Sequence, residues 1–198
     1  PEAVYETLQV MNTLQPGLCV LGTRLPGCFN VFEMSVRAVL GQQITVKAAS
    51  TLAARLVAVY GTQVQTGIEG LTHSFPAPAA ILALGENSSE HLGKLGIISA
   101  RANTIYQLAR VLADEKNDFG FWGNPEEEMQ KLQAIRGIGS WTAQYIAMRA
   151  MGWPDAFLPT DAGIKKALPD HTPKELQALS EAWRPWRSYA TVNLWNTL

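Results

Sequence analysis

Apolar residues recur every three or four positions along most of the chain, the spacing that places them on one face of an α-helix. In the first fourteen residues, for example, Val4, Leu8 and Met11 follow this period. No segment shows the strict apolar–polar alternation of a half-buried strand. Val64 and Phe75, in the irregular segment 62–78, belong either to a short strand pairing or to a packed loop. The sequence therefore predicts an all-α fold, with helices over residues 1–14, 31–40, 46–60, 79–84, 100–113, 162–168, 174–183 and 185–195. Another short helix begins at residue 88 or 89 and ends around residues 93–96. Two more helices flank a glycine turn: one opens at Asn124-Pro125 and stops at Gly137, and the other opens at residue 139 or 140.

Helix-capping residues precede several of these segments. Asn30, followed by Glu33 three residues later, predicts a reciprocal capping box. Thr45 and Ser99 stand where a side chain can accept from the first turn of the next helix. Pro185 suits the first turn of the last helix because it has no N–H to leave unpaired. These residues fix where we expect the helices to begin.

The rest of the chain is arranged around a predicted helical hairpin. Gly137, Ile138 and Gly139 separate two helices, and glycine is expected there because it tolerates positive φ angles. Either Gly139 or Ser140 opens the second helix. Such a turn leaves backbone N–H groups unpaired and pointing outward, which suits one phosphate of a nucleic-acid backbone. The structural interpretation, a Gly-x-Gly turn made for packing alone, remains open.

Two further segments relate to this hairpin. Trp153-Pro154 and Leu158-Pro159 break the chain after the second helix, and Asp161 follows directly. Asp161 can be the N-cap of the next helix, and it can also supply a carboxylate for chemistry. The segment 95–99 is similar to the hairpin turn, so a second, degenerate copy of the hairpin is a further hypothesis.

Composition excludes some function classes and leaves others open. Apolar residues make up 47% of the chain, but no run approaches the roughly 20 apolar residues of a membrane span. We see no signal peptide, and Pro1 is no initiator residue, so we expect a fragment or a processed chain. Cys19 and Cys28 lack metal-type spacing, which argues for a reducing compartment and against an iron–sulfur cluster.

Charge gives little help in choosing a partner. The formal net charge is −1, so no global basic footprint marks nucleic-acid binding. Cations do gather around the hairpin, although such a cluster is equally consistent with a solvated face, and a site that grips phosphate through backbone amides needs few of them. The charged residues concerned are Lys131, Arg136, Arg149, Lys165 and Lys166, opposed by Asp155 and Asp161.

The order of motifs resembles that of the DNA glycosylases built on a helix-hairpin-helix, a Gly/Pro-rich loop and an essential Asp, and most of all their 3-methyladenine DNA glycosylase II branch. The resemblance rests on Leu132-x-x-Ile135-x-Gly137-Ile138-Gly139-x-Trp141-Thr142-Ala143-x-Tyr145 followed by Phe157-Leu158-Pro159-Thr160-Asp161. It implies two helical lobes around a DNA-binding cleft. Residues 31–145 would form the central lobe, ending in the hairpin, and residues 1–30 with 146–198 the second. The α+β domain that precedes these lobes in the 3-methyladenine enzymes is not in the sequence.

The resemblance also assigns chemistry. It implies that the catalytic residue is Asp161, which would stabilise the positive charge that develops on the sugar and orient or deprotonate water. The amides of Gly137, Gly139 and Thr142 would hold a phosphate. Bifunctional relatives place a nucleophilic Lys where Trp141 stands, so the resemblance implies hydrolysis without a Schiff base. No cofactor is expected to be required. Some relatives hold a monovalent cation on hairpin carbonyls, which here would belong to Gln133, Ile135 and Ile138.

A base inside a duplex must be flipped out before it can be excised, so a pocket and a loop that fills the gap are expected. Trp141, Tyr145 and Trp186 are the implied base-binding wall, with Phe29 as an addition, because electron-rich rings attract an alkylated, cationic purine. Gln42 and Gln43 would enter the minor groove. A polar helix end without function explains these two glutamines equally well, and some relatives carry an apolar wedge at the position of Gln43. Arg187 would contact phosphate, support Asp161 or form a structural salt bridge.

The sequence thus predicts a monofunctional glycosylase of base excision repair that acts on alkylated purines such as 3-methyladenine in double-stranded DNA. We expect a monomer without membrane attachment, in the bacterial cytoplasm with the nucleoid. A glycosylase for oxidised or deaminated bases is the alternative within enzymes. A non-catalytic helix-hairpin-helix module is the alternative outside them, and it explains Gly137 and Gly139 but not Asp161 with its aromatic neighbours.

Overall fold

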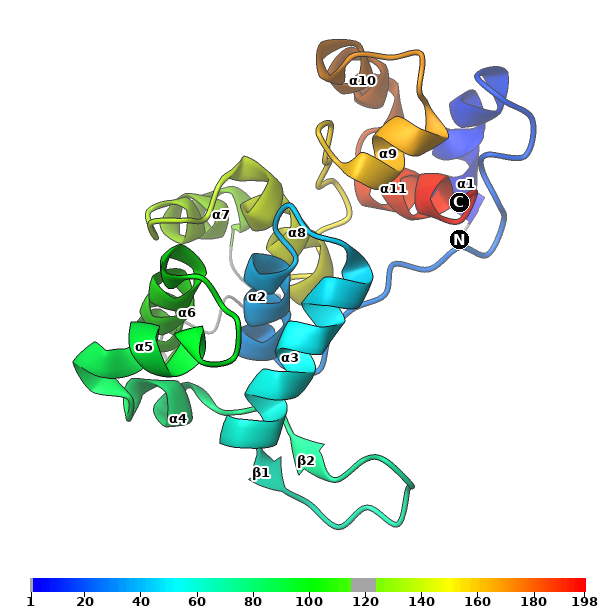
Figure 1. The fold of residues 1–198 in the computed structure, drawn as a ribbon. Coiled ribbons are helices and arrows are strands. Elements are labelled where there is room, and N and C mark those ends of the chain that lie inside the picture. Colours follow the sequence, from blue (N-terminus) through cyan, green and yellow to red (C-terminus); the bar gives the residue numbers. More distant parts are fainter. Residues whose placement is uncertain (1, 115–123) are drawn as a thin grey trace.

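In the computed structural model, which describes residues 2–114 and 124–198, the helices form two groups (Figure 1). The first group contains α2 to α8 with a small sheet, and the second contains α1 and α9 to α11. The elements are α1 (Glu2–Leu8), η1 (Gln9–Thr13), α2 (Val31–Leu40), α3 (Val46–Tyr60), β1 (Thr62–Gln63), β2 (His73–Ser74), α4 (Pro78–Leu82), η2 (Gly85–Asn87), α5 (Ser88–Gly93), α6 (Ser99–Leu112), α7 (Pro125–Gln133), α8 (Ser140–Ala150), α9 (Ala162–Ala167), α10 (Pro173–Ser180), η3 (Glu181–Trp183) and α11 (Arg187–Trp195). The predicted all-α class is confirmed.

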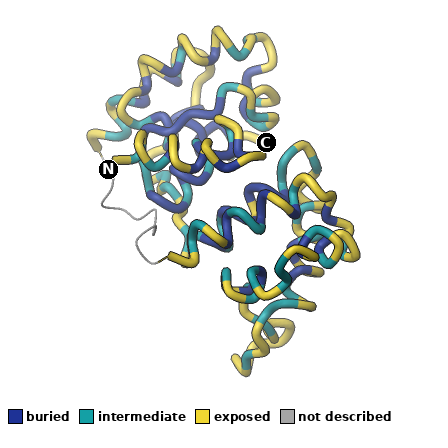
Figure 2. The backbone as a smooth tube through the Cα atoms, turned by 90° about the vertical axis from the view of Figure 1, so that its left-hand side faces the viewer, coloured by how far each residue is buried: buried dark blue, intermediate teal, exposed yellow. Residues whose placement is uncertain are grey.

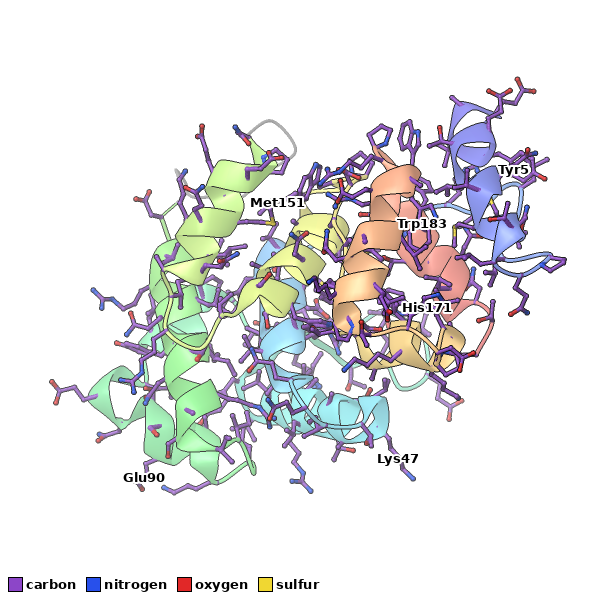
Figure 3. The ribbon with its side chains drawn as sticks, turned by 90° about the horizontal axis from the view of Figure 1, so that it is seen from above. Tyr5, Lys47, Glu90, Met151, His171 and Trp183 are labelled. Atoms are coloured by element: carbon purple, nitrogen blue, oxygen red, sulfur yellow. The ribbon has the colours of Figure 1, made fainter. Side chains whose placement is uncertain are left out.

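Each group of helices has its own apolar core, and buried segments run through both (Figure 2). Helices α2 to α8 enclose the larger core, to which α8 contributes Ile146 and Ala147. The smaller core lies among α1, α9, α10 and α11, and it takes Met148 from the same helix α8. Figure 3, seen from above, shows Met151 at the first group and Trp183 within the second. Helix α8 therefore joins the two cores, so a residue on α8 can face both lobes.

The irregular segment 62–78 contains the strand pairing that the sequence left open. Strands β1 and β2 are antiparallel, with Thr62 opposite Ser74. Phe75 packs edge-on against Phe32 of α2, with ring centroids 6.4 Å apart. The pairing and the packing therefore occur together, and they attach this segment to the larger core.

Several helices begin differently from the prediction. The Asn30 carboxamide does accept from the Glu33 amide, but the Glu33 carboxylate pairs with Arg37 at 2.8 Å instead of completing the predicted box. Ser99 is not a cap: it is the first residue of α6, and Ile98 is the N-cap without a side-chain bond. The last helix begins at residue 187, two residues after Pro185.

The first predicted helix, residues 1–14, is shorter than expected. An α-helix over residues 2–8 passes into the 3-10 helix η1, and residue 1 lies outside the described residues. Residues 174–183 likewise divide into α10 and the 3-10 helix η3. None of the helices in the described ranges is long and apolar enough to cross a bilayer.

Candidate active site at the hairpin

The Asp161 carboxylate is held by four N–H donors. Its Oδ1 accepts from the backbone amides of Gly163 and Ile164 at 2.9 and 3.1 Å and from the Trp195 indole at 2.8 Å. Its Oδ2 accepts from the Trp141 indole at 3.2 Å. Asp161 is therefore the N-cap of α9, as expected. Within the described residues Oδ2 accepts this single hydrogen bond, so it keeps capacity for a further donor.

Aromatic rings from both lobes meet beside this carboxylate. Trp141 and Tyr145, one turn apart on α8, stack with ring centroids 5.2 Å apart and an interplanar angle of 7°. The ring of Trp195, at the end of α11, lies 6.3 Å from Tyr145 at an angle of 50°. Their spacing of four residues places Trp141 and Tyr145 on one face of α8. The site is thus an acid with flat, electron-rich surfaces around it.

Trp195 supplies this indole, whereas the sequence predicts Trp186 as the tryptophan from the C-terminal segment. The ring of Trp186 packs edge-on against Tyr189, with centroids 5.7 Å apart, and no ring contact within the described ranges joins it to Trp141 or Tyr145. Gly163 is the signal that a bulky group approaches α9 closely, although a glycine does not say which residue that group belongs to. A Cβ at Gly163 would lie 2.7 Å from the Trp195 ring, so a glycine inside α9 marks the close approach of this indole.

The hairpin turn uses its two glycines differently. Gly137 has φ +97°, and a Cβ there would lie 2.1 Å from the Thr104 hydroxyl oxygen on α6. That hydroxyl donates to the Arg136 carbonyl at 2.9 Å, so a residue of α6 supports the turn through a hydrogen bond. Gly139, in contrast, has φ −91°, so the predicted positive φ is wrong at this residue. Apart from its two chain neighbours, no heavy atom of the described residues lies within 4 Å of the position its Cβ would take.

Gly139 is the N-cap of α8, and this cap supplies no side-chain acceptor to the first turn. The first amides of α8 lack partners within the helix, as an anion site requires, and Gly139 places no side chain beside them. Thr142, whose amide belongs to this turn, has a buried side chain that accepts from Gln42 Nε2 at 2.9 Å. The structure thus brings Gly137, Gly139 and Thr142 together at one helix start.

The three carbonyls named for a cation belong to the last residue of α7 and to the segment that joins it to α8. The Ile135 carbonyl accepts from the Ile138 amide at 3.0 Å, which leaves it a second lone pair. Gln133 is the last residue of α7, where carbonyls lack partners within the helix. Neutral carbonyl oxygens suit a hard cation, so the residues present fit such an ion.

The two glutamines predicted to enter DNA are placed differently. Gln42 turns inward: its Nε2 donates to the Gly137 carbonyl at 2.9 Å as well as to Thr142. Gln43 is exposed and has φ +55°, a conformation that non-glycine residues rarely adopt. Gln43 is therefore the one of the pair whose side chain is available to a partner, and the inward direction of Gln42 could not be read from the sequence.

Two arginines near the site are both held by contacts within the protein, since Arg149 Nη1 donates to the Tyr145 hydroxyl at 3.3 Å. Arg187 is buried and binds both carboxylate oxygens and the backbone carbonyl of Asp155, the shortest of these contacts being 2.7 Å, which matches the structural salt bridge among its three interpretations. Arg149 stands with its guanidinium carbon 5.7 Å from the centre of the Tyr145 ring, and its Nε is buried without a hydrogen-bond partner in the described part of the chain. Burial raises the pKa of the neighbouring Cys28 thiol, and the charge of Arg149 opposes that shift. Phe29, the proposed addition to the wall, is fully exposed.

Comparison with known proteins gives one consistent result. The family model described as HhH-GPD superfamily base excision DNA repair protein matches residues 36–186. The chain is 36% identical over 197 residues to DNA-3-methyladenine glycosylase 2 of Escherichia coli, covering 100% of this chain and 66% of that protein. It is 41% identical over 203 residues to a probable bifunctional transcriptional activator/DNA repair enzyme AlkA of Mycobacterium tuberculosis, covering 100% of this chain and 40% of that one.

Among solved structures, the 3-methyladenine DNA-glycosylase from Archaeoglobus fulgidus matches with a TM-score of 0.79 at 24% identity, covering 99% of this chain and 69% of that one. At this identity the likeness concerns the fold. The chain spans just under two thirds of the E. coli relative and two fifths of the mycobacterial one.

Proposed function

Because the chain belongs to the HhH-GPD superfamily of base excision DNA repair proteins, we propose that it is a monofunctional DNA glycosylase for alkylated purines such as 3-methyladenine. It would hydrolyse the bond between the base and deoxyribose C1′ and leave an abasic site in an intact strand. One observation carries the proposal: the Asp161 carboxylate is hydrogen-bonded to Trp141 and lies beside the stacked rings of Trp141 and Tyr145.

The aromatic rings account for the substrate class. Alkylation at a ring nitrogen gives a purine a formal positive charge, and it also makes the base a better leaving group. A cation over an indole or phenol face gains about 0.5–2 kcal/mol. The rings of Trp141, Tyr145 and Trp195 offer such faces to a base flipped out of the duplex. A modest preference is enough, because the leaving group is already activated.

Asp161 accounts for the reaction. As the C1′–N bond breaks, the base leaves with the electron pair and positive charge develops on the sugar. A fixed carboxylate stabilises that charge, and Oδ2 has the capacity to accept a proton from the attacking water. The water oxygen then forms the new bond to C1′. The tethering of Oδ1 by three N–H groups keeps the carboxylate oriented throughout.

The absence of a lyase step follows from the residue at the nucleophile position. Trp141 stands where bifunctional relatives carry a Lys, and its indole N–H is committed to Asp161. Lys165 and Lys166 are exposed on α9, beyond Asp161. Water therefore remains as the nucleophile, and we propose that no covalent enzyme–DNA intermediate forms.

Partners and ions complete the proposal. We propose that the amides of Gly137, Gly139 and Thr142 hold a phosphate of double-stranded DNA, and that a monovalent cation on the carbonyls of Gln133 and Ile135, with that of Ile138, supports the turn. The protein acts as a monomer in the bacterial cytoplasm. The open space at Gly139 supports the phosphate site. A glycosylase for oxidised or deaminated bases would use the same acid but would gain less from the aromatic faces.

The proposal is tested with Asp161→Asn. Asparagine is an equally good helix N-cap, so α9 is expected to form, but its neutral amide cannot stabilise the developing charge. We expect release of 3-methyladenine from methylated DNA to fall by at least about 100-fold, with affinity for an abasic-site duplex retained. The matched control is Asp170→Asn, an exposed acid near the end of α9, which should leave base release unchanged.

Three outcomes would overturn the proposal. Binding of damaged DNA by the wild-type protein without release of any base would leave only a DNA-binding module. Borohydride trapping of a covalent protein–DNA adduct would replace hydrolysis with a lyase mechanism. Release of oxidised or deaminated bases from defined oligonucleotides, in the absence of 3-methyladenine release, would select the alternative substrate class.

A further inference from the structure

The loop between α2 and α3 is held from two sides at a single residue, Gln42. On one side its side chain donates to the Gly137 carbonyl and the Thr142 hydroxyl, both at 2.9 Å. On the other side its carbonyl accepts from the guanidinium of Arg101 on α6. Thr142 is the third residue of α8, and Arg101 is the third residue of α6. The two helices therefore hold the same residue from equivalent positions.

Gln43, the residue that follows Gln42, has an unusual backbone conformation. Gln43 has φ +55°, and it is the one non-glycine residue in the described ranges with a positive φ. A side chain in this conformation clashes with its own backbone and persists only where the surroundings impose it. The contacts of Gln42 are the surroundings on the N-terminal side of Gln43. They hold the residue from which the backbone of Gln43 continues.

Arg101 has no competing structural role in the described part of the chain. It takes part in none of the ion pairs found there, and its hydrogen bond to the Gln42 carbonyl is its one contact of that kind. A half-buried guanidinium carries five N–H donors, and aiming one at a backbone carbonyl costs the residue conformational freedom. We expect an arginine to be used in this way where the backbone at the accepting carbonyl, here that of Gln42, must be held in place.

We propose that Arg101 and Gln42 are positioning residues that hold Gln43 in its strained conformation, ready to enter the gap that a flipped base leaves in the duplex. Gln42 is then a link between the phosphate-holding turn and the inserting residue, in place of a DNA contact of its own. The inference rests on the proposed function, because a protein that does not flip bases has no gap to fill. It assigns the α6 side of the loop a part in damage recognition.

The test compares Arg101→Gln, Arg101→Lys and the control Arg55→Gln, each alone and combined with Gln43→Ala. Arg55 is the matched control because its Nη1 also donates to a backbone carbonyl, that of Leu95 at 3.1 Å, without contact to the loop. The probes are a duplex with a tetrahydrofuran abasic analogue opposite 2-aminopurine, and the same duplex without damage. Affinity and 2-aminopurine fluorescence are measured across a range of salt concentrations.

We expect Arg101→Gln to weaken binding of the tetrahydrofuran duplex by about 10-fold, to reduce the fluorescence change, and to leave the undamaged duplex within about 2-fold. Arg101→Lys should recover part of the loss, because it keeps a donor, and Arg55→Gln should match the wild type. On the Gln43→Ala background the effect of Arg101→Gln should disappear. If thermal unfolding shows that Arg101→Gln is not folded, Thr142→Val removes the hydrogen bond on the other side of Gln42 instead. We then expect a smaller loss of affinity for the tetrahydrofuran duplex.

Three results would overturn the inference. Equal losses with and without Gln43 would show that Arg101 does not act through that residue. If Arg101→Gln reduces the slope of log affinity against log salt concentration by about 1, Arg101 is a phosphate contact. If Arg101→Gln and Arg55→Gln give the same affinity and the same fluorescence change, Arg101 has no role in positioning Gln43. If instead the wild-type protein neither prefers the tetrahydrofuran duplex nor releases a base, the proposed function itself fails.

Discussion

Two turns of this molecule share one backbone design. Gly96 and Gly137 have φ +90° and +97°, and in each case a buried isoleucine follows, then an N-cap without a side-chain bond, then a serine that opens the helix. The matched positions are Gly96 and Gly137, Ile97 and Ile138, Ser99 and Ser140, Ala102 and Ala143, Ile105 and Ile146, and Ala109 and Ala150. The structure thus agrees with the hypothesis that the segment 95–99 is a degenerate copy of the hairpin turn.

The differences between the two turns lie in the side chains around the same backbone. At the N-cap, Gly139 leaves open space, whereas Ile98 presents an exposed apolar side chain. At the next helical positions, the aromatic pair of α8 corresponds to Ala100 and Thr104 on α6. Backbone geometry alone therefore does not make a DNA site. The open N-cap and the aromatic face make the hairpin of α7 and α8 different, and each can be altered separately.

The largest expected effect concerns the turn glycines. Gly137→Ala combines a strained φ with a clash against the Thr104 hydroxyl, so we expect a loss of about 3 kcal/mol in the free energy of unfolding. Gly96→Ala has the strain, but its Cβ would meet the flexible Arg55 guanidinium at 3.1 Å and Leu52 Cδ2 at an ordinary contact distance of 3.5 Å, so about 1–2 kcal/mol is expected. Urea-induced unfolding measures both.

The clash has its own check. Thr104→Ala removes the hydroxyl that the new Cβ would strike. The cost of Gly137→Ala should therefore be smaller on the Thr104→Ala background than alone, because contacting residues are not additive. Equal costs on the two backgrounds would mean that strain in φ alone makes Gly137 necessary, and the two turns would then be energetically alike.

The second prediction transfers the N-cap of one turn to the other. Gly139→Ile fills the open space with a side chain. No heavy atom of the described residues other than the chain neighbours lies within 4 Å of the new Cβ, so the free energy of unfolding should fall by no more than about 1 kcal/mol, the cost of a less favourable N-cap residue. It should block the approach of a phosphate and weaken binding of a tetrahydrofuran duplex by about 10- to 100-fold. Fluorescence anisotropy measures the affinity. The reverse change, Ile98→Gly, should not weaken binding, and a similar loss from both would make the turns equivalent.

The third prediction concerns the contact between the turns. Thr104 of α6 donates its hydroxyl to the Arg136 carbonyl at 2.9 Å, so the copy supports the hairpin. Thr104→Val keeps the shape and removes that bond, which should lower the free energy of unfolding by about 1 kcal/mol. Thr51→Val, on the exposed face of α3, is the control, since its hydroxyl bonds only within its own helix. A loss no greater than that of the control would mean that this contact does not support the turn.

How much the sequence revealed depends on the range of the interactions involved. Helix positions and the hairpin follow from local spacing and from glycine, and Asp161 follows from a run of motifs. Trp195 does not, because its place beside Asp161 depends on how α11 packs on α9, and six tryptophans offered no local reason to choose it. The inward direction of Gln42 is likewise set by groups about a hundred residues away.

The smallest effects are expected at the serines that open the two helices. The sequence suggests that Ser99 is a cap, but it is already the first helical residue, and Ser140 is its counterpart. Neither side chain serves as the N-cap, so Ser99→Ala and Ser140→Ala should each change the free energy of unfolding by less than about 0.5 kcal/mol. Thr45→Ala is the contrast: the Thr45 hydroxyl accepts from the Ala48 amide at 3.2 Å, and its loss should cost about 1 kcal/mol. Urea-induced unfolding of the three variants measures these changes. If Ser140→Ala lowers the free energy of unfolding as much as Thr45→Ala does, the Ser140 side chain caps the first turn of α8. Its amides would then be less available to a phosphate than the open Gly139 implies.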